Sequence, residues 1–135
     1  MRMRICQENC CFLCGVEEES HDHLFFRCRY SVRCLNLVAG WLRLIVPVDG
    51  VFDWWVRLRV RSLLLKQIVA VAIYSLIYRL WMSRNACRLD RVLPIPTVLC
   101  SDVRNDVLLR ISVCNDVVKY SRIRRWVQEL RGRTC

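Results

Sequence analysis

Strand-like alternation, internal repeats and low-complexity linkers are all missing from this chain of 135 residues. A β-sheet with one buried face would need apolar and polar residues to alternate along each strand, and no useful length of the chain does so. Glycine and proline are scarce, at four and three residues, and neither interrupts the run SLLLKQIVAVAIYSLIYRLWMSRNACRLD. These absences predict a mostly α fold, and the chain is long enough for one domain to bury a core.

Lysine is also scarce, because only Lys66 and Lys119 are lysines among 22 basic residues, which face 12 acidic ones. The formal charge is +10, and arginine offers a planar fork of donors that suits phosphate oxygens. Such a charge favours attraction to polyanions, although it carries no information about the fold. The charge therefore predicts nucleic acid as a partner, with a solvated basic surface as the alternative interpretation.

An apolar run of signal-peptide length is absent from the first residues, MRMRICQENC. The sequence therefore predicts a nuclear or cytoplasmic protein that is not secreted, in which the ten cysteines stay reduced. The uncharged run between Lys66 and Arg79 is far shorter than the about 20 apolar residues of a membrane span, so no span is predicted. The scattered cysteines are interpreted as small core hydrophobes or exposed strays: Cys34, Cys87, Cys100, Cys114 and Cys135.

Apolar residues at three- and four-residue steps predict a first helix that follows Ser20, a suitable N-cap. Gly40 marks its end or a weak point in it, and a loop follows around residues 47–50. The resulting division is a zinc-binding module with its following helix at 1–45, an apolar helical segment of the same domain at 46–92, and a C-terminal amphipathic helix at 97–135.

The apolar segment opens with a short helix at Asp53-Trp54-Trp55 and continues into a helix that is apolar on nearly every side between Ile68 and Ile77. This pattern predicts a central helix buried on most of its surface, or a variant whose apolar face, at 63–81, awaits a protein partner. Proline ends this helix in LPIPT at 93–97. Thr97 or Ser101 then caps a long amphipathic helix that is predicted to run to about Leu130.

Cysteine and histidine gather between residues 10 and 28, in the pattern C-x2-C-x8-H-x4-C. Cys11 and Cys14 form a close pair followed by Gly15, which tolerates the positive φ of a sharp turn. His23 and Cys28 form the second pair, and the whole set matches the four ligands of a structural zinc site. Cys10 in place of Cys11, His21 in place of His23, and a loop of free thiols without metal are the alternatives.

The geometry of the second pair constrains the local fold. His23 and Cys28 would lie about 140° apart on an ideal helix of 3.6 residues per turn. Both side chains therefore cannot reach one ion from a regular helix. We expect His23 just before or within a frayed first turn, with Cys28 reaching back.

The stretch CFLCGVEEESHDHLFFRCRYS resembles the zinc-binding domain that follows the reverse transcriptase in plant LINE-type (non-LTR) retrotransposons. That family's pattern is similar to C-x-L-C-G, a variable acidic stretch, E-S-x-x-H-L-F-F-x-C and a segment leading to a tryptophan, where this chain has Cys34-Leu35. Further on, LIYRLWMSRNACRLD is similar to the family's W-x-x-R-N helix. The resemblance covers roughly residues 6–90, and it places the presumed zinc ligands and the helix motif as follows: Cys11, Cys14, His23 and Cys28, then Trp81, Arg84 and Asn85.

The resemblance implies a non-catalytic zinc-binding module from a retrotransposon polyprotein that binds nucleic acid. Phe25 and Phe26 are interpreted as packing over the zinc rather than touching a base. The alternative is a helical protein-interaction or architectural segment with a purely structural zinc, including a decayed copy of the element. The expected nucleic-acid contacts are an aromatic ring and three arginines beside the ligands: Phe12, Arg27, Arg29 and Arg33.

Catalytic patterns are missing as well. The chain has neither the aspartate pair of a polymerase palm nor the acidic set of an RNase H, and it has no phosphate-binding loop or nucleophile–base pair. Four protein ligands would also leave zinc no open position for water. The sequence therefore predicts a protein that is not an enzyme and has no small-molecule substrate.

Overall fold

The structure is a computed structural model that describes residues 9–45, 57, 63–89, 92–113 and 124–135. Within these ranges the regular elements are helical, apart from one isolated bridge between Cys10 and Glu18, so the predicted mostly α fold with a Cys/His module and several helices is confirmed. The predicted loop at 47–50 and short helix at Asp53-Trp54-Trp55 lie outside the described residues. The elements are η1 (His23–Arg27), α1 (Arg29–Leu42), α3 (Leu63–Arg88), α4 (Pro96–Val113) and α6 (Arg124–Gly132).

The first helical region differs from the single helix predicted after Ser20. Its start is as predicted, because the Ser20 hydroxyl accepts a hydrogen bond of 3.0 Å from the His23 backbone N–H. The helix is then interrupted at Cys28, whose backbone is extended (φ −58°, ψ 129°), so that η1 and α1 are separate elements.

Gly40 does not end α1. The helix continues to Leu42 and ends where Arg43 adopts a left-handed conformation with a φ of 56°. The N–H groups of Arg43 and Leu44 donate back to carbonyls of the last turn, at 3.1 and 2.8 Å. Such backbone bonds satisfy the free carbonyls at a helix end, and they do so here without glycine in the left-handed position.

The long helix α3 is buried along one stripe, not on most of its surface as predicted. Its buried side packs against α1 and α4, which cover only that side, and the opposite side is exposed. Whether a protein partner covers the exposed side stays a prediction. The buried stripe consists of Ile68, Val69, Ala72, Leu76, Leu80 and Ser83.

By length and composition, the stretch Leu65–Arg88 within α3 is sufficient to cross a membrane, and 28% of its most apolar window is buried. Core helices of soluble proteins pass the same test, so this is only weak evidence that α3 crosses a membrane.

Polar side-chain contacts also join α3 to α4. The Arg79 guanidinium contacts both carboxylate oxygens of Asp106 on α4 at 2.8 Å, and Ser75 donates a hydrogen bond to the same carboxylate.

One continuous helix across 97–130 was predicted, and this is wrong. Such a helix would carry residues 100 and 135 about 50 Å apart. Instead Cys100 and Cys135 form a disulfide with their Cα atoms 6.1 Å apart, so the chain must fold back between α4 and α6. Neither Thr97 nor Ser101 caps α4, because Pro96 already occupies its first position, where the missing N–H costs nothing.

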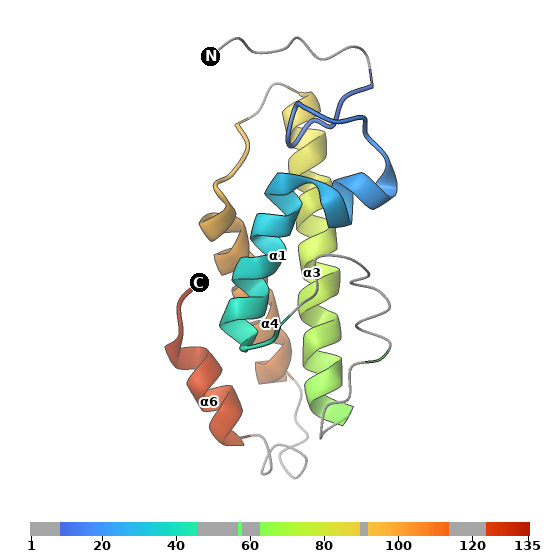
Figure 1. The fold of residues 1–135 in the computed structure, drawn as a ribbon. Coiled ribbons are helices and arrows are strands. Elements are labelled where there is room, and N and C mark those ends of the chain that lie inside the picture. Colours follow the sequence, from blue (N-terminus) through green and yellow to red (C-terminus); the bar gives the residue numbers. More distant parts are fainter. Residues whose placement is uncertain (1–8, 46–56, 58–62, 90–91, 114–123) are drawn as a thin grey trace.

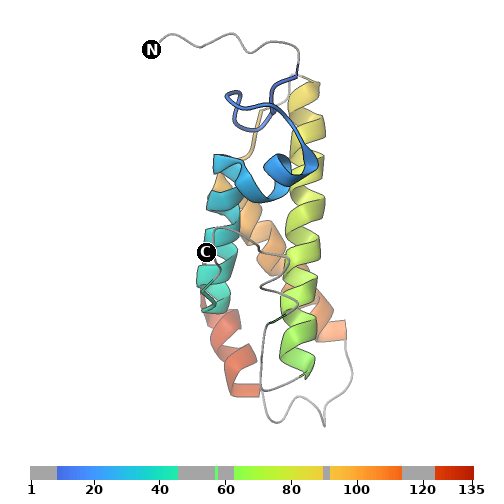
Figure 2. The same cartoon turned by 45° about the vertical axis from the view of Figure 1, so that its right-hand side comes forward.

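The terminal helix α6 lies at the C-terminal end of α1 (Figures 1 and 2). The Trp41 indole N–H donates to the Leu130 carbonyl at 3.2 Å, and the Arg133 guanidinium donates to the Trp41 carbonyl at 3.2 Å. We call the four helices α1, α3, α4 and α6 the helical layer, because their buried side chains form one continuous core.

The prediction that all ten cysteines stay reduced is wrong for Cys10, Cys100 and Cys135, which are disulfide-bonded. Cys34 is fully buried and free, as expected of a small core hydrophobe, and Cys87 is free and half-buried. Disulfide pairing depends on which Cα atoms the fold brings within about 7 Å, and the spacing along the chain does not reveal it.

Candidate metal centre

The segment 9–28, which we call the metal loop, lies against the C-terminal end of α3 (Figures 1 and 2). Its first half is a narrow hairpin in which the Cys11 N–H donates to the Glu17 carbonyl and the Glu19 N–H donates to the Asn9 carbonyl, both at 2.8 Å. At the tip, the Gly15 N–H donates to the Cys11 carbonyl at 2.8 Å, and Gly15 has a φ of 65°. The sharp turn predicted after the first cysteine pair is therefore present, with glycine in the left-handed conformation.

The second pair is positioned by a π-turn, which was not predicted. In η1 the Cys28 N–H donates to the His23 carbonyl at 2.6 Å, a bond that spans five residues. A π-turn is wider than an α-turn, so it brings residues five apart onto the same side. This geometry replaces the expected frayed turn, and it removes the angular separation that a regular helix would impose on His23 and Cys28.

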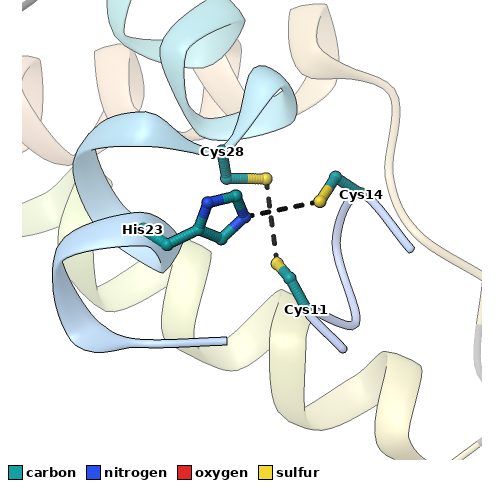
Figure 3. Close-up of side chains that lie close together, drawn as sticks. All are labelled: Cys11, Cys14, His23 and Cys28. Carbon is teal, nitrogen blue, oxygen red and sulfur yellow. Dashed lines mark hydrogen bonds between the residues drawn. The ribbon is translucent and has the colours of Figure 1, made fainter. Parts of the chain in front are cut away.

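All four predicted ligands point toward one centre (Figure 3), and their ligand atoms lie within 4.8 Å of one another. The sulfurs of Cys11 and Cys28 are 3.8 Å apart, and the Cys14 sulfur is 3.4 Å from His23 Nε2. A tetrahedral ion with metal–sulfur bonds of about 2.3 Å would need sulfurs about 3.8 Å apart and a sulfur–nitrogen separation of about 3.6 Å. The four residues therefore fit a tetrahedral metal ion.

The two alternative ligands, Cys10 and His21, do not belong to the converging group. Cys10 is disulfide-bonded and offers no thiolate to a metal. His21 is exposed and does not belong to the group of converging ligand atoms, whereas the His23 side chain is buried. Of the substitutions left open by the spacing, the structure favours Cys11 and His23.

Glu17 orients the histidine. Its carboxylate lies 3.2 Å from His23 Nδ1, on the opposite side of the ring from the nitrogen that faces Cys14. A carboxylate that accepts the Nδ1 proton fixes the tautomer with a free lone pair on Nε2, which is the arrangement that metal-bound histidines generally have. The charge of Glu17 therefore prepares His23 to bind a metal through Nε2.

Glu19 ties the metal loop to α3. Its carboxylate contacts the Arg84 guanidinium at 2.6 and 3.0 Å, and it accepts a hydrogen bond of 3.4 Å from the Phe12 N–H. The Arg84 guanidinium also lies 5.1 Å from the centre of the Phe12 ring and 5.4 Å from that of Trp81. Arg84 thereby joins the turn between the first two ligands to α3.

The two thiols of the first pair differ in acidity. Burial raises the pKa of Cys11 to about 12. Burial also raises the pKa of Cys14, but hydrogen bonds from the backbone N–H groups of Glu17 and Val16, together with the contact with His23, outweigh it and lower the value to about 7. Without a metal, Cys14 is therefore the more easily ionised of the two thiols.

The residues predicted to contact nucleic acid occupy different surroundings. Phe12 is half-exposed beneath Arg84, as described above. Arg27 is exposed and forms an ion pair of 2.7 Å with Asp22, which offsets its charge. Arg29 and Arg33 are exposed on α1, one turn apart. Among the described residues, no ring contact joins Phe12 to any of the three arginines, and their role in binding stays a prediction.

The sequence pattern does not single out Glu17 and Glu19, which belong to the variable acidic stretch of the resembled family. Side chains two apart on an extended segment point to the same face, and Glu18, between them, occupies the isolated bridge opposite Cys10. Alternation within EEES is the only sequence feature that distinguishes the two glutamates. The Cys34-Leu35 pair, where the resembled family tends to have tryptophan, is buried on α1 within the core.

No protein-family model matches this chain, and no curated protein or solved structure matches it.

Proposed function

We propose that this chain is a non-catalytic zinc-binding module that binds nucleic acid, related to the zinc-binding domain that follows the reverse transcriptase in plant LINE-type retrotransposons. The observation that carries the proposal is the convergence of Cys11, Cys14, His23 and Cys28, whose ligand atoms all lie within 4.8 Å of one another. Three thiolates and one imidazole are a common donor set of structural zinc sites.

The second support is a contact between the two motifs that carry the resemblance. Arg84 of W-x-x-R-N reaches Glu19 of the Cys/His stretch, although 65 positions separate them in the sequence. Trp81 of the same motif lies under that guanidinium. The helix motif thus supports the metal loop directly, which gives a physical reason for the two motifs to occur together.

A non-catalytic role for the ion follows from the donor set. With four protein ligands, a tetrahedral zinc has no open position at which water could be activated. The ion would therefore order residues 9–28 and take no part in bond-making chemistry. The nucleic-acid part of the proposal is supported by the formal charge of +10 and by the predominance of arginine over lysine.

Removal of the metal tests zinc binding and nucleic-acid binding together. Zinc with three thiolates carries about one negative charge more than three neutral thiols, so chelation makes the chain slightly more positive. Pure electrostatics then predicts equal or tighter binding to a labelled single strand. We expect weaker binding after chelation, recovered when zinc is added back, because the ordered metal loop contributes contacts.

Binding that stays unchanged or becomes tighter without zinc would favour the alternative, a helical protein-interaction segment with a purely structural zinc. Salt dependence alone cannot decide between them, because any basic chain loses affinity for nucleic acid as salt rises. The comparison must therefore be made at one fixed ionic strength.

A further inference from the structure

Three aromatic side chains form a row along the exposed side of α3. Tyr74, Tyr78 and Trp81 are spaced by four and three residues, and they are 67%, 61% and 41% exposed. On a helix of 3.6 residues per turn, this row lies opposite the buried stripe that includes Ala72, Leu76 and Ser83. Successive positions of the row are separated by about 4.5–6 Å along the helix axis. The row is therefore a line of exposed aromatic side chains on one side of α3.

The row continues onto the metal loop. The Arg84 guanidinium lies 5.4 Å from the centre of the Trp81 ring and 5.1 Å from that of Phe12, which is itself 46% exposed. Arg84 is held in this place by Glu19. An exposed ring from the turn between Cys11 and Cys14 is thus added to the three rings of α3.

The chemistry of this surface indicates one kind of partner. Every charged residue of α3 is a cation, namely Lys66, Arg79, Arg84 or Arg88. Arg88 is exposed, follows Trp81 by two turns and forms no ion pair with the described residues. Flat aromatic rings beside cations, on a chain of formal charge +10, are complementary to a chain of bases joined by phosphates.

We propose that four aromatic side chains form a stacking row for the bases of a single-stranded nucleic acid: Phe12, Tyr74, Tyr78 and Trp81. Arg88, on the same side of α3, would contact its phosphates. This inference rests on the nucleic-acid binding proposed above and names the surface responsible for it. It assigns the contact to α3 and to one residue of the metal loop, and leaves Arg27, Arg29 and Arg33 outside the row. About four bases would fit, within the range of about 4–16 nucleotides known for single-strand sites.

The test uses the full, zinc-loaded chain and two labelled strands of equal length, one of oligothymidine and one abasic. Tyr78→Ala should weaken binding to oligothymidine about tenfold, because the loss of one base stacked on an aromatic ring lowers affinity by about that factor. Tyr74→Ala should do the same, and Tyr78→Phe should retain binding because it keeps the ring. Binding to the abasic strand should change in none of these variants.

Leu109→Ala is the matched control, because Leu109 is as exposed as the row residues but lies on α4. It should leave binding to both strands unchanged, and zinc content and helical signal should be equal in all variants. Equal binding of oligothymidine by wild type and Tyr78→Ala would overturn the row while leaving the proposed function intact. If the wild-type chain bound neither strand, both the stacking row and the proposed nucleic-acid binding would be overturned.

Two other occupants of the same surface are distinguishable. If the row instead joined two copies of the chain, Tyr78→Ala would abolish self-association seen by sedimentation without nucleic acid. If it met a lipid surface, wild type but not Tyr78→Ala would float with anionic vesicles. Either result, with strand binding unaffected by Tyr78→Ala, overturns the proposal.

Discussion

The metal loop lies at one end of the helical layer, and the two regions are held together by different forces. In the helical layer, α1, α3, α4 and α6 share a core of apolar side chains that extends from Leu35 to Leu130. Apart from the four candidate ligands, the metal loop adds only Leu13 and Leu24 to this core among its described apolar residues that are buried. A segment this short cannot bury enough apolar surface to order itself, so small domains of this kind usually require a metal or disulfides.

The contrast teaches where polar contacts matter in this chain. In the helical layer, the pair Arg79–Asp106 supplements a core that already exists. In the metal loop, the contacts of Glu17 with His23 and of Glu19 with Arg84 set the positions of the ligands themselves. Changes in the metal loop should therefore alter metal affinity, and changes in the helical layer should alter global stability.

Loss of one ligand should have the largest effect. Cys14→Ser is expected to weaken zinc binding by more than about 100-fold, because even residues that only support a ligand can account for 10- to 100-fold. Zinc competition with a chromophoric chelator measures this. Cys87→Ser is the matched control, a free cysteine of α3 outside the cluster, and should bind zinc like the wild type. Equal weakening in both variants would refute the assignment.

Acid should separate the two regions. Zinc binds thiolates, so Cys11, with a pKa of about 12, must lose a proton at every pH below that value, which lowers affinity about tenfold per pH unit. Cys14, with a pKa of about 7, adds a second factor of about ten per unit only below pH 7. Apparent zinc affinity should therefore fall as pH falls, and more steeply below pH 7. A pH-independent affinity between pH 6 and 8 would contradict this.

The helical layer should outlast the metal loop in acid. The Arg79 guanidinium, despite the opposing effect of burial, lowers the pKa of the Asp106 carboxyl below its usual value of 3.8. The stability from this pair is thus fully present above pH 3.8 and is lost only as the pH falls through the lowered value. Helical circular dichroism should persist at pH values at which zinc has already dissociated. Loss of both at one pH would show that the two regions unfold together.

Removal of the disulfide between Cys100 and Cys135 should affect the helical layer alone. It closes a loop of 35 residues, and the chain-entropy model gives a stabilisation of about 3–4 kcal/mol for that length. Cys135→Ser should lower the free energy of unfolding by an amount of this order in denaturant titrations and leave zinc affinity unchanged. A change of zinc affinity as large as that caused by Cys14→Ser would remove the distinction between the two regions.

Two arginines of α3 provide the finest comparison. Arg84→Ala should weaken zinc binding about tenfold, because it removes a mostly buried partner of Glu19 and the support of the Phe12 turn. Arg79→Ala should leave zinc affinity unchanged and lower the unfolding free energy by about 1 kcal/mol, since the pair with Asp106 is about one-third exposed. Identical effects of the two variants on zinc affinity would show that Arg84 has no special role at the metal loop.

Local features of this fold were predictable from the sequence, and contacts between distant segments were not. The spacing of Cys11, Cys14, His23 and Cys28 suffices to nominate a four-ligand site, and Gly15 marks the turn. The π-turn at His23 was not predictable, because it widens one turn without a characteristic residue. The ties between Glu19 and Arg84 and between Cys100 and Cys135 depend on how the helices pack, which residue periodicity does not specify.

The exposed side of α3 is a second feature that the sequence could not predict. Its sequence is apolar on nearly every side, so periodicity could not separate the buried stripe from the face that carries Tyr74 and Tyr78. Only the positions of α1 and α4 determine which side is covered. The exposed aromatic row is thus a property of the packing.

X-ray absorption at the zinc edge of the purified, zinc-loaded chain tests the metal centre most directly. Coordination by Cys11, Cys14, His23 and Cys28 predicts three sulfur neighbours at about 2.3 Å and one nitrogen at about 2.0–2.1 Å. In Cys14→Ser, the number of sulfur neighbours should fall to two. Four sulfurs, or a shell of oxygen and nitrogen without sulfur, would contradict the proposed site.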